Sequence, residues 1–187
     1  ICRQLDGLPL AIELIAARMR LMSPQALLER LNDPFILFSD GMRGIPARQK
    51  TLHNAIGWSY HALTPEEQEI FAGLAVFSGG FTLETAEAVF SGSFTGKTVI
   101  DLLTSLVDKS LLKRVISPEG EVRFIMLVTI QKFALARLRQ ADQEAVARDA
   151  HLAYLLDLAE RADKAMRGPD QAKWGVRLEG ERDNFRA

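Results

Sequence analysis

The sequence predicts a mainly α-helical chain: a helical subdomain, then a winged helix with a small two-stranded β-hairpin, then repeat-like helices. Apolar residues recur at the i, i+3, i+4 and i+7 spacing of amphipathic helices through most of the chain. One stretch, residues 111–127, instead holds two extended runs around the turn sequence SPEG, which is typical of a hairpin. The three predicted helices directly before this hairpin complete the order of elements in a winged helix, with an extra helix on each side.

The first predicted helix follows a tight turn around Gly7 and Pro9. Gly7 can adopt the positive φ that ends a helix, and Pro9 can take the first position of the next helix, where a missing N–H costs nothing. Residues 10–22 are apolar nearly all round, so we expect a helix that is buried on several sides. Because little sequence is present to cover it, we expect the chain to be part of a longer protein.

Residues 32–47, rich in Pro, Gly, Asn and Asp, are predicted to be a linker and the best domain boundary in the chain. Before it, Ser23 and Pro24 predict a short helix over residues 24–31. After it, apolar spacing predicts helices over residues 48–61, 65–75, 83–90, 99–107 and 129–139. The second of these should begin with a capping box, in which Thr64 is the N-cap and Glu67 the third residue.

From Ala145 onward the composition is Ala-rich and helical, with Leu152, Leu155 and Leu156 in one stripe. Gly168 and Pro169 predict a turn before a last helix. A pair of antiparallel helices of this length suits the start of a helical repeat array, although one pair does not establish a period.

The composition excludes several classes of function. A net charge of −1 gives no general reason to bind nucleic acid or an anionic membrane. The single cysteine, Cys2, excludes an internal disulfide, and no apolar run reaches the ~20 residues of a membrane span. His53, His61 and His151 lack the spacing of metal ligands, and no nucleophile motif is present. We therefore expect neither a metal site nor a catalytic site.

Residues 91–98, SGSFTGKT, come close to a phosphate-binding loop. That motif requires Gly, four residues and then Gly-Lys-Ser/Thr, whereas Ser91 stands here at the first position and Gly92 comes one residue too late. A phosphate loop also follows a buried strand, but the preceding residues have helical spacing. We interpret the stretch as a loop between helices.

A winged helix raises the question of DNA binding, and the helix from about Lys97 to Lys109 would be the one that enters a groove. Groove readers need Arg or Lys to neutralise phosphates and polar side chains to read base edges. Here Asp101 and Asp108 offset the two lysines, so the helix has no net positive face. The wing adds a small basic spot, interpreted as a solvated strand face, from Lys113, Arg114 and Arg123.

Several stretches of the sequence, in order, are similar to one protein family. They are residues 2–14 (CRQLDGLPLAIEL), 51–60, 74–84 (LAVFSGGFTLE), 106–112 (LVDKSLL), 123–134 and 181–187 (ERDNFRA). On these motifs the chain resembles the bacterial STAND-class regulators, which are related to the NB-ARC ATPases. The resemblance implies a division into the end of a helical domain that follows the nucleotide-binding fold, a winged-helix domain, and the start of a tetratricopeptide-like superhelical sensor. The corresponding ranges are 1–46, 47–141 and 142–187.

The resemblance also implies a nucleotide contact. In the family the Gly-Leu-Pro-Leu turn touches the base, and its Pro packs on adenine, in the intact parent protein. The matching residues are Gly7, Leu8, Pro9 and Leu10. A Glu and an Arg are usual near the nucleotide phosphates, at the junction between the wing and the next helix. This chain has Val128 and Gln131 there, so no phosphate-sensing residue is assigned.

The function that the resemblance implies is a switch module of a cytoplasmic transcriptional regulator. ADP would hold the parent closed, and exchange for ATP, helped by an inducer at the sensor, would open it and permit homo-oligomerisation. The partners would be an upstream nucleotide-binding domain and the sensor. Neither nucleotide is expected to bind this chain alone, and no ATPase activity is expected, because a phosphate-loop lysine and a magnesium carboxylate are absent. Two alternatives remain: a winged-helix DNA-binding domain, and a helical-repeat scaffold for protein interactions.

Overall fold

The computed structural model describes residues 9–20, 23–26, 47–90, 92, 94, 96–117 and 120–187. Helix α1 (Pro9–Ala16) runs into a 3-10 helix, η1 (Ala17–Arg20), and packs against α4 (Ala47–His61). One face of α1 is fully buried, whereas Pro9 and Glu13 on the other face are exposed. The predicted helix over residues 24–31 is described only at its start, where the Ser23 hydroxyl accepts a hydrogen bond from the Ala26 amide. The predicted linker up to residue 46 lies outside the described residues.

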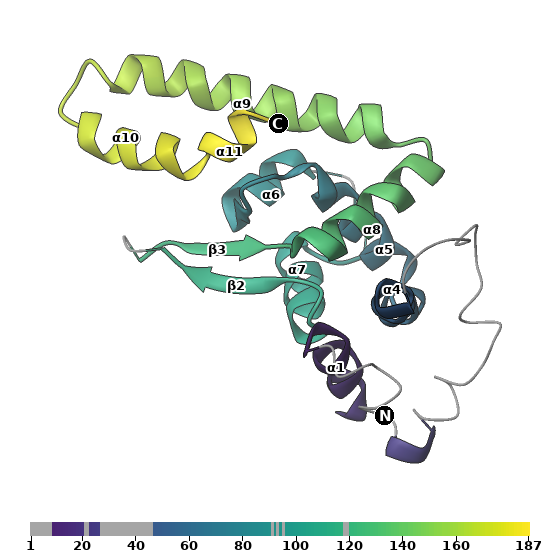
Figure 1. Ribbon diagram of the computed structural model, residues 1–187. Coiled ribbons are helices and arrows are strands. Elements are labelled where there is room, and N and C mark those ends of the chain that lie inside the picture. Colours follow the sequence, from purple (N-terminus) through teal and green to yellow (C-terminus); the bar gives the residue numbers. More distant parts are fainter. Residues whose placement is uncertain are drawn as a thin grey trace.

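The winged helix follows α4, and its elements come in the predicted order (Figure 1). They are α5 (Pro65–Gly73), η2 (Leu74–Val76), β1 (Phe81–Thr82), α6 (Leu83–Val89), α7 (Val99–Asp108), β2 (Lys113–Ile116) and β3 (Val122–Ile125). The predicted capping box at α5 is present, because Thr64 and Glu67 exchange hydrogen bonds. Thr82 and Thr98 cap α6 and α7 in the same way, by accepting amide hydrogen bonds.

The sheet has three antiparallel strands in the order β1-β3-β2, so the prediction of a two-stranded hairpin was incomplete. The added strand, β1, is two residues long and pairs Phe81 with Phe124. The rings of these two residues stack, with 5.8 Å between their centroids. A two-residue strand has no periodicity of its own, and tertiary pairing alone forms it.

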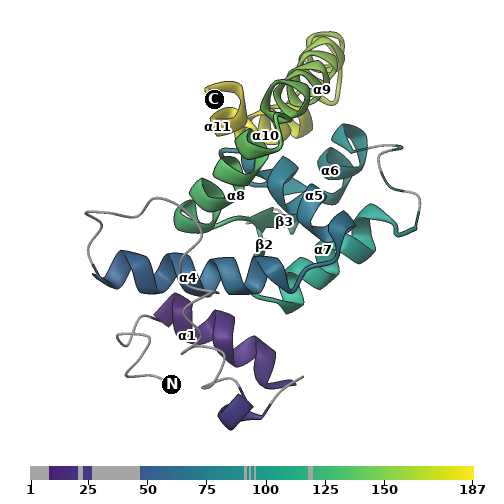
Figure 2. The same ribbon diagram turned by 90° about the vertical axis from the view of Figure 1, so that its right-hand side faces the viewer.

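Helix α8 (Val128–Gln140) closes the winged helix, and α9 (Glu144–Ala165) then lies across α6 and η2. The chain turns at Gly168 and Pro169 as predicted and returns along α9 through α10 (Gln171–Gly180) and α11 (Arg182–Phe185). The predicted last helix is therefore broken in two at Glu181. Helices α9–α11 lie on one side of the winged helix and α1 on the opposite side (Figures 1 and 2).

The main core joins α1, α4 and the winged helix in one apolar cluster. Its largest fully buried side chains include Phe71, Phe81 and Leu102. A smaller cluster of Tyr154, Leu155 and Leu158 on α9 has Val89 of α6 and Trp174 of α10 packed against it. Polar contacts also join α9–α11 to the winged helix, among them those of Asn184 with the turn 78–80 and of Tyr154 with Thr85. No helix among the described residues is long and apolar enough to cross a membrane.

Candidate functional site

Helix α7 occupies the position of the groove-entering helix in a winged helix, and its two sides differ sharply. Leu102, Leu103 and Leu106 are completely buried against the core. The solvent side carries exposed Ile100, Asp101, Thr104 and Asp108. The Asp101 carboxylate accepts hydrogen bonds from Thr98, and these lower the pKa of Asp101. The exposed side of α7 thus carries two acidic residues, and the helix itself contains no Lys or Arg.

The two lysines that flank α7 are turned toward one carboxylate on α5. Lys109 Nζ lies 2.7 Å from Glu67 Oε2, and Lys97 Nζ lies 3.6 Å from Glu67 Oε1. The Ser105 hydroxyl also donates to Glu67, at 2.7 Å. Burial alone would raise the pKa of Glu67, but hydrogen bonds from Lys109, Ser105 and the Thr64 amide outweigh it and lower the pKa to about 2. The lysines thus neutralise an internal charge instead of adding to the exposed face of α7.

The wing is more apolar than basic on its exposed surface. Every residue of β2 is exposed, and Val115, Ile116 and Val122 are 36%, 63% and 38% exposed. Lys113 has its ammonium 4.0 Å from the Glu13 carboxylate of α1. Arg114 is exposed as predicted.

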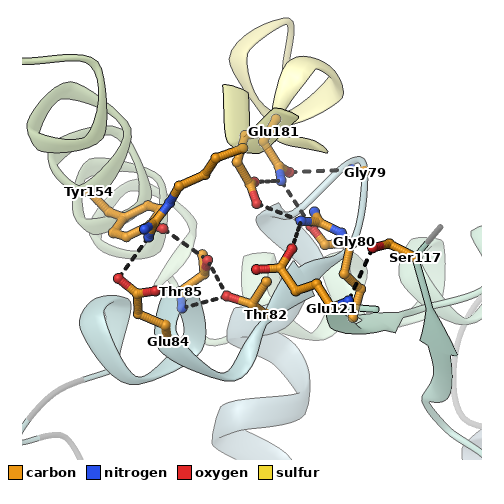
Figure 3. Close-up of polar contacts among 12 residues, drawn as sticks. Gly79, Gly80, Thr82, Glu84, Thr85, Ser117, Glu121, Tyr154 and Glu181 are labelled. Atoms are coloured by element: carbon orange, nitrogen blue, oxygen red, sulfur yellow. Dashed lines mark hydrogen bonds and ion pairs between the residues drawn. The ribbon is translucent and has the colours of Figure 1, made fainter. Parts of the chain in front are cut away.

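Arg123 does not belong to a solvated basic spot, and that prediction was wrong. Its side chain is nearly buried, and its Nη1 donates to Glu181 Oε1 at 2.8 Å (Figure 3). Its Nη2 donates to the Gly80 carbonyl at 3.2 Å, and Glu121 of the wing lies 3.7 Å away. A buried guanidinium needs such partners because an unpaired buried charge is costly. Arg123 therefore joins the wing to the segment between α10 and α11.

Asn184 of α11 completes this contact with the winged helix. Its Oδ1 accepts from the amides of Ser78 and Gly79, at 2.8 and 3.3 Å. Its Nδ2 donates to the Gly80 carbonyl at 2.8 Å and to Glu181 Oε2 at 2.6 Å. Glu181 and Asn184 are only 3% and 2% exposed. One amide side chain thus satisfies three backbone groups of the turn before β1, which would otherwise be left without these partners.

A second row of polar contacts links α6 to the C-terminal helices. The hydroxyls of Thr85 and Tyr154 are 3.0 Å apart, and Thr85 is also bound by Thr82 (Figure 3). Arg177 of α10 donates to the Glu84 carboxylate at 2.7 Å. Next to these contacts, a groove of about 620 Å³ opens between the wing and α10, with Trp174 and Arg177 among its walls.

The predicted nucleotide-contact residues are only partly described. Pro9 is the exposed first residue of α1, and Leu10 is half-buried against the core; Gly7 and Leu8 lie outside the described residues. The adenine contact therefore stays a prediction. At the junction near the expected phosphates, Val128 is 65% exposed. Gln131 donates to the carbonyls of Ala75 and Phe77, so it holds η2 in place.

The remaining sequence motifs form no phosphate or metal site within the described residues. Residues 83–89, before the loop SGSFTGKT, form helix α6, as expected for a loop between helices. The described residues contain no group of His, Cys, Asp and Glu that could hold a metal ion. His61 is exposed, and His53 is half-buried with its ring edge-on to Phe133.

Sequence reasoning missed the importance of Glu67, Glu181, Asn184 and His151. The sequence identified Glu67 as a member of the capping box, but it did not reveal that Lys97 and Lys109 pair with it. Asn184 had only its position in the ERDNFRA motif. His151 is 6% exposed and packs edge-on against Phe77, and its buried Nε2 atom has no hydrogen-bond partner within the described part of the chain.

Comparison with known proteins gives one domain match and several relatives. Residues 63–139 match the model of a winged helix-turn-helix domain. The whole chain is 43% identical over 193 residues to the Mycobacterium tuberculosis protein (strain ATCC 25618 / H37Rv) named "Putative HTH-type transcriptional regulator Rv0890c", and equally to its Mycobacterium bovis counterpart Mb0914c. A second M. tuberculosis protein, Rv0894, is 36% identical over 145 residues, which is 76% of this chain and 37% of that protein.

The chain spans about a fifth, 21%, of the length of the relatives that it matches throughout. The matched residues 63–139 coincide with the elements from α5 to α8. The chain thus contains a winged helix-turn-helix domain, and over its full length it is homologous to part of proteins named as HTH-type transcriptional regulators.

Proposed function

We propose that this chain is the regulatory winged-helix segment of a longer transcriptional regulator, and that its winged helix contacts protein instead of reading DNA bases. The observation that carries the proposal is the exposed side of α7. It presents Asp101, Asp108 and Ile100, while the flanking lysines are bound to Glu67.

The electrostatics of this face argue against a DNA groove. Each base pair carries two phosphate charges, and binding energy comes largely from Lys and Arg that neutralise them. The two exposed carboxylates on the groove-entering helix would instead meet phosphates and acceptor-rich base edges. An exposed isoleucine between charged residues is better suited to a protein surface, where apolar anchors carry much of the binding energy.

The test is titration of the purified chain into a fluorescent duplex DNA at 50 and 200 mM salt. The expected result is a dissociation constant weaker than about 100 µM at both, the weak limit of non-specific binding. Micromolar binding that falls steeply with salt would overturn the proposal. The Asp108→Lys variant serves as a comparison, because it removes one repulsive charge and adds a phosphate contact at the same position.

The second candidate, a winged-helix DNA-binding domain, is favoured by the domain match at residues 63–139 and by the names of the relatives. In that case β2, with Lys113 and Arg114, would supply the backbone contacts. Loss of micromolar affinity in the Arg114→Ala variant would support it.

A finer proposal concerns the nucleotide switch that the family resemblance implies. Pro9 is exposed at the start of α1, so its ring is free to meet an adenine held by an upstream domain of the parent protein. We propose that ADP and ATP bind to that parent and not to this chain alone. Calorimetric titration of ADP into both proteins tests this: the parent should bind, and its Pro9→Ala variant should bind more weakly. A parent that binds no nucleotide would refute the switch.

A further inference from the structure

We infer that residues 181–184 act as a latch that sets the orientation of the wing, so that β3 and helices α10–α11 move as one body. The latch comprises Arg123 of β3, Glu181 and Asn184, together with the turn 78–80 that they bind. The inference goes beyond the proposed function, because it assigns to the C-terminal helices control over the surface that the wing offers to a partner.

The latch is buried, and both Nη atoms of Arg123, both carboxylate oxygens of Glu181 and the side-chain amide of Asn184 are hydrogen-bonded. Arg123, Glu181 and Asn184 are 8%, 3% and 2% exposed. Both oxygens of Glu181 are used, one by Arg123 and the other by Asn184. Such a network allows few alternative geometries, because a shift of any member leaves a buried polar group unpaired. It therefore specifies one position of the wing relative to α11.

Residues around the latch are closely packed. A Cβ atom on Gly79 would lie 2.9 Å from Cβ of Asp183, and one on Gly180 would lie 3.3 Å from Nη1 of Arg123. At Gly79 the turn thus approaches α11 so closely that a larger residue would displace Asp183, whereas at Gly180 the neighbour is the end of the flexible Arg123 side chain. The contact is specific in shape as well as in charge.

The latch joins the wing to the C-terminal helices through one residue of the wing, Arg123. A groove of about 620 Å³ opens between the wing and α10, and it is lined by the outward-facing parts of both. The wing is therefore tied to the C-terminal helices at the latch, whereas across the groove it has room to move. Contacts between parts of a chain that are small and polar permit relative motion unless something fixes them. Opening the latch is expected to free the wing without unfolding the core.

The test measures the distance between wing and α10 in the full chain. Spin labels are placed at Ile116→Cys and Ala172→Cys, both exposed positions, with the only natural cysteine replaced by Cys2→Ser. Pulsed electron resonance should give one narrow distance distribution, and Asn184→Ala should at least double its width. The matched control is Glu179→Gln, because Glu179 is exposed and bonded only to Arg182 in the described structure.

Hydrogen exchange supplies a second readout. Asn184→Ala should speed exchange of the Ser78 and Gly79 amides about tenfold, and exchange in β3 and α11 should rise with them, since one body opens as a unit. Amides of α5 should keep their protection. If Asn184→Ala fails to fold, Glu181→Gln replaces it, because this variant keeps the shape and loses only the charge.

Two results would overturn the inference. In one, the distance distribution stays narrow in both Asn184→Ala and Glu181→Gln, with faster exchange only at Ser78 and Gly79. In the other, Glu179→Gln broadens the distribution as much as the latch variants do. Neither readout depends on DNA binding, so the inference about the latch is tested separately from the proposed function.

Discussion

Arg123 in β3 and Glu181 beyond α10, 58 positions apart in sequence, form an ion pair in the interior with 2.8 Å between Nη1 and Oε1. Taking both charges out of water costs free energy that their attraction repays only with good geometry. Removal of one partner leaves the other as an unpaired buried charge, whereas removal of both does not. Single and double replacements should therefore differ in their effect on the free energy of unfolding.

The Glu181→Leu variant is expected to lower the free energy of unfolding by about 3 kcal/mol, because the Arg123 guanidinium is left buried without its carboxylate. The Arg123→Met/Glu181→Leu double variant should lose clearly less than the sum of the two single variants, since it buries no lone charge. Equilibrium urea denaturation of the four proteins measures this cycle. Strict additivity would show that the two side chains act independently.

Glu67 should make the stability of the chain depend on acid. Its pKa in the folded state, about 2, is below the ordinary value of 4.5, so folding favours the charged form. Its contribution is therefore complete above about pH 4.5 and is lost as the pH falls toward 2. We expect a loss of about 2 kcal/mol over this range, less than the full shift because water partly screens the site.

The Glu67→Gln variant checks that expectation. Thermal unfolding between pH 2 and pH 7 should show a smaller acid dependence in this variant than in the unchanged chain. Glu66→Gln, at the neighbouring and more exposed position, is the matched control and should leave the acid dependence as it was. Equal slopes for the Glu67→Gln variant and the unchanged chain would contradict the role given to the lysines.

His151 should act over a higher pH range. Burial lowers its pKa below the ordinary value of 6.5; the charge of Arg148 also lowers it, while Glu181 opposes the shift. The unfolded chain then binds the proton more readily, so stability is complete above about pH 6.5 and falls as the pH drops below it. His151→Leu should reduce the difference in melting temperature between pH 5 and pH 7.5. The exposed His61→Gln should not change it, and part of the effect should remain through His53, whose pKa burial also lowers.

The helical parts of the fold follow closely from local sequence. Thr64 and Thr98 stand where a side-chain oxygen can bind the amide three residues on, and both capping boxes form. The apolar spacing at Leu102, Leu103 and Leu106 identifies the buried side of α7 because a helix repeats every 3.6 residues. Each of these patterns involves residues within one or two helical turns, so it can be recognised without knowledge of the tertiary structure.

The latch could not be predicted in this way. Asn184 binds Gly80 across 104 residues, and nothing near either residue encodes the other. Arg123 has the alternating neighbours of an exposed strand position, and its closest partners in the fold, Glu181 and the Gly80 carbonyl, are both distant in sequence. The partner of the two lysines beside α7 was not predictable for the same reason, since Glu67 lies on another helix. Where a charge is paired over long range, its exposure cannot be inferred from its own segment.

Gly80 and Gly120 offer a direct test of how tightly the turn before β1 is held. Both have positive φ, +77° and +86°, so an alanine at either position pays for the left-handed backbone, about 1 kcal/mol. A Cβ at Gly80 would also lie 2.6 Å from the Phe124 carbonyl oxygen, whereas no atom of the described residues lies within 4 Å of one at Gly120. Gly80→Ala should therefore destabilise the chain by clearly more than Gly120→Ala, by about 2 kcal/mol or above in urea denaturation. Because the clash is with backbone of β3, it cannot be relieved by a side-chain rotation, and the strand must move away from the turn. Equal losses at the two glycines would mean that β3 yields at little cost, and that the pairing of β1 with β3 is weak.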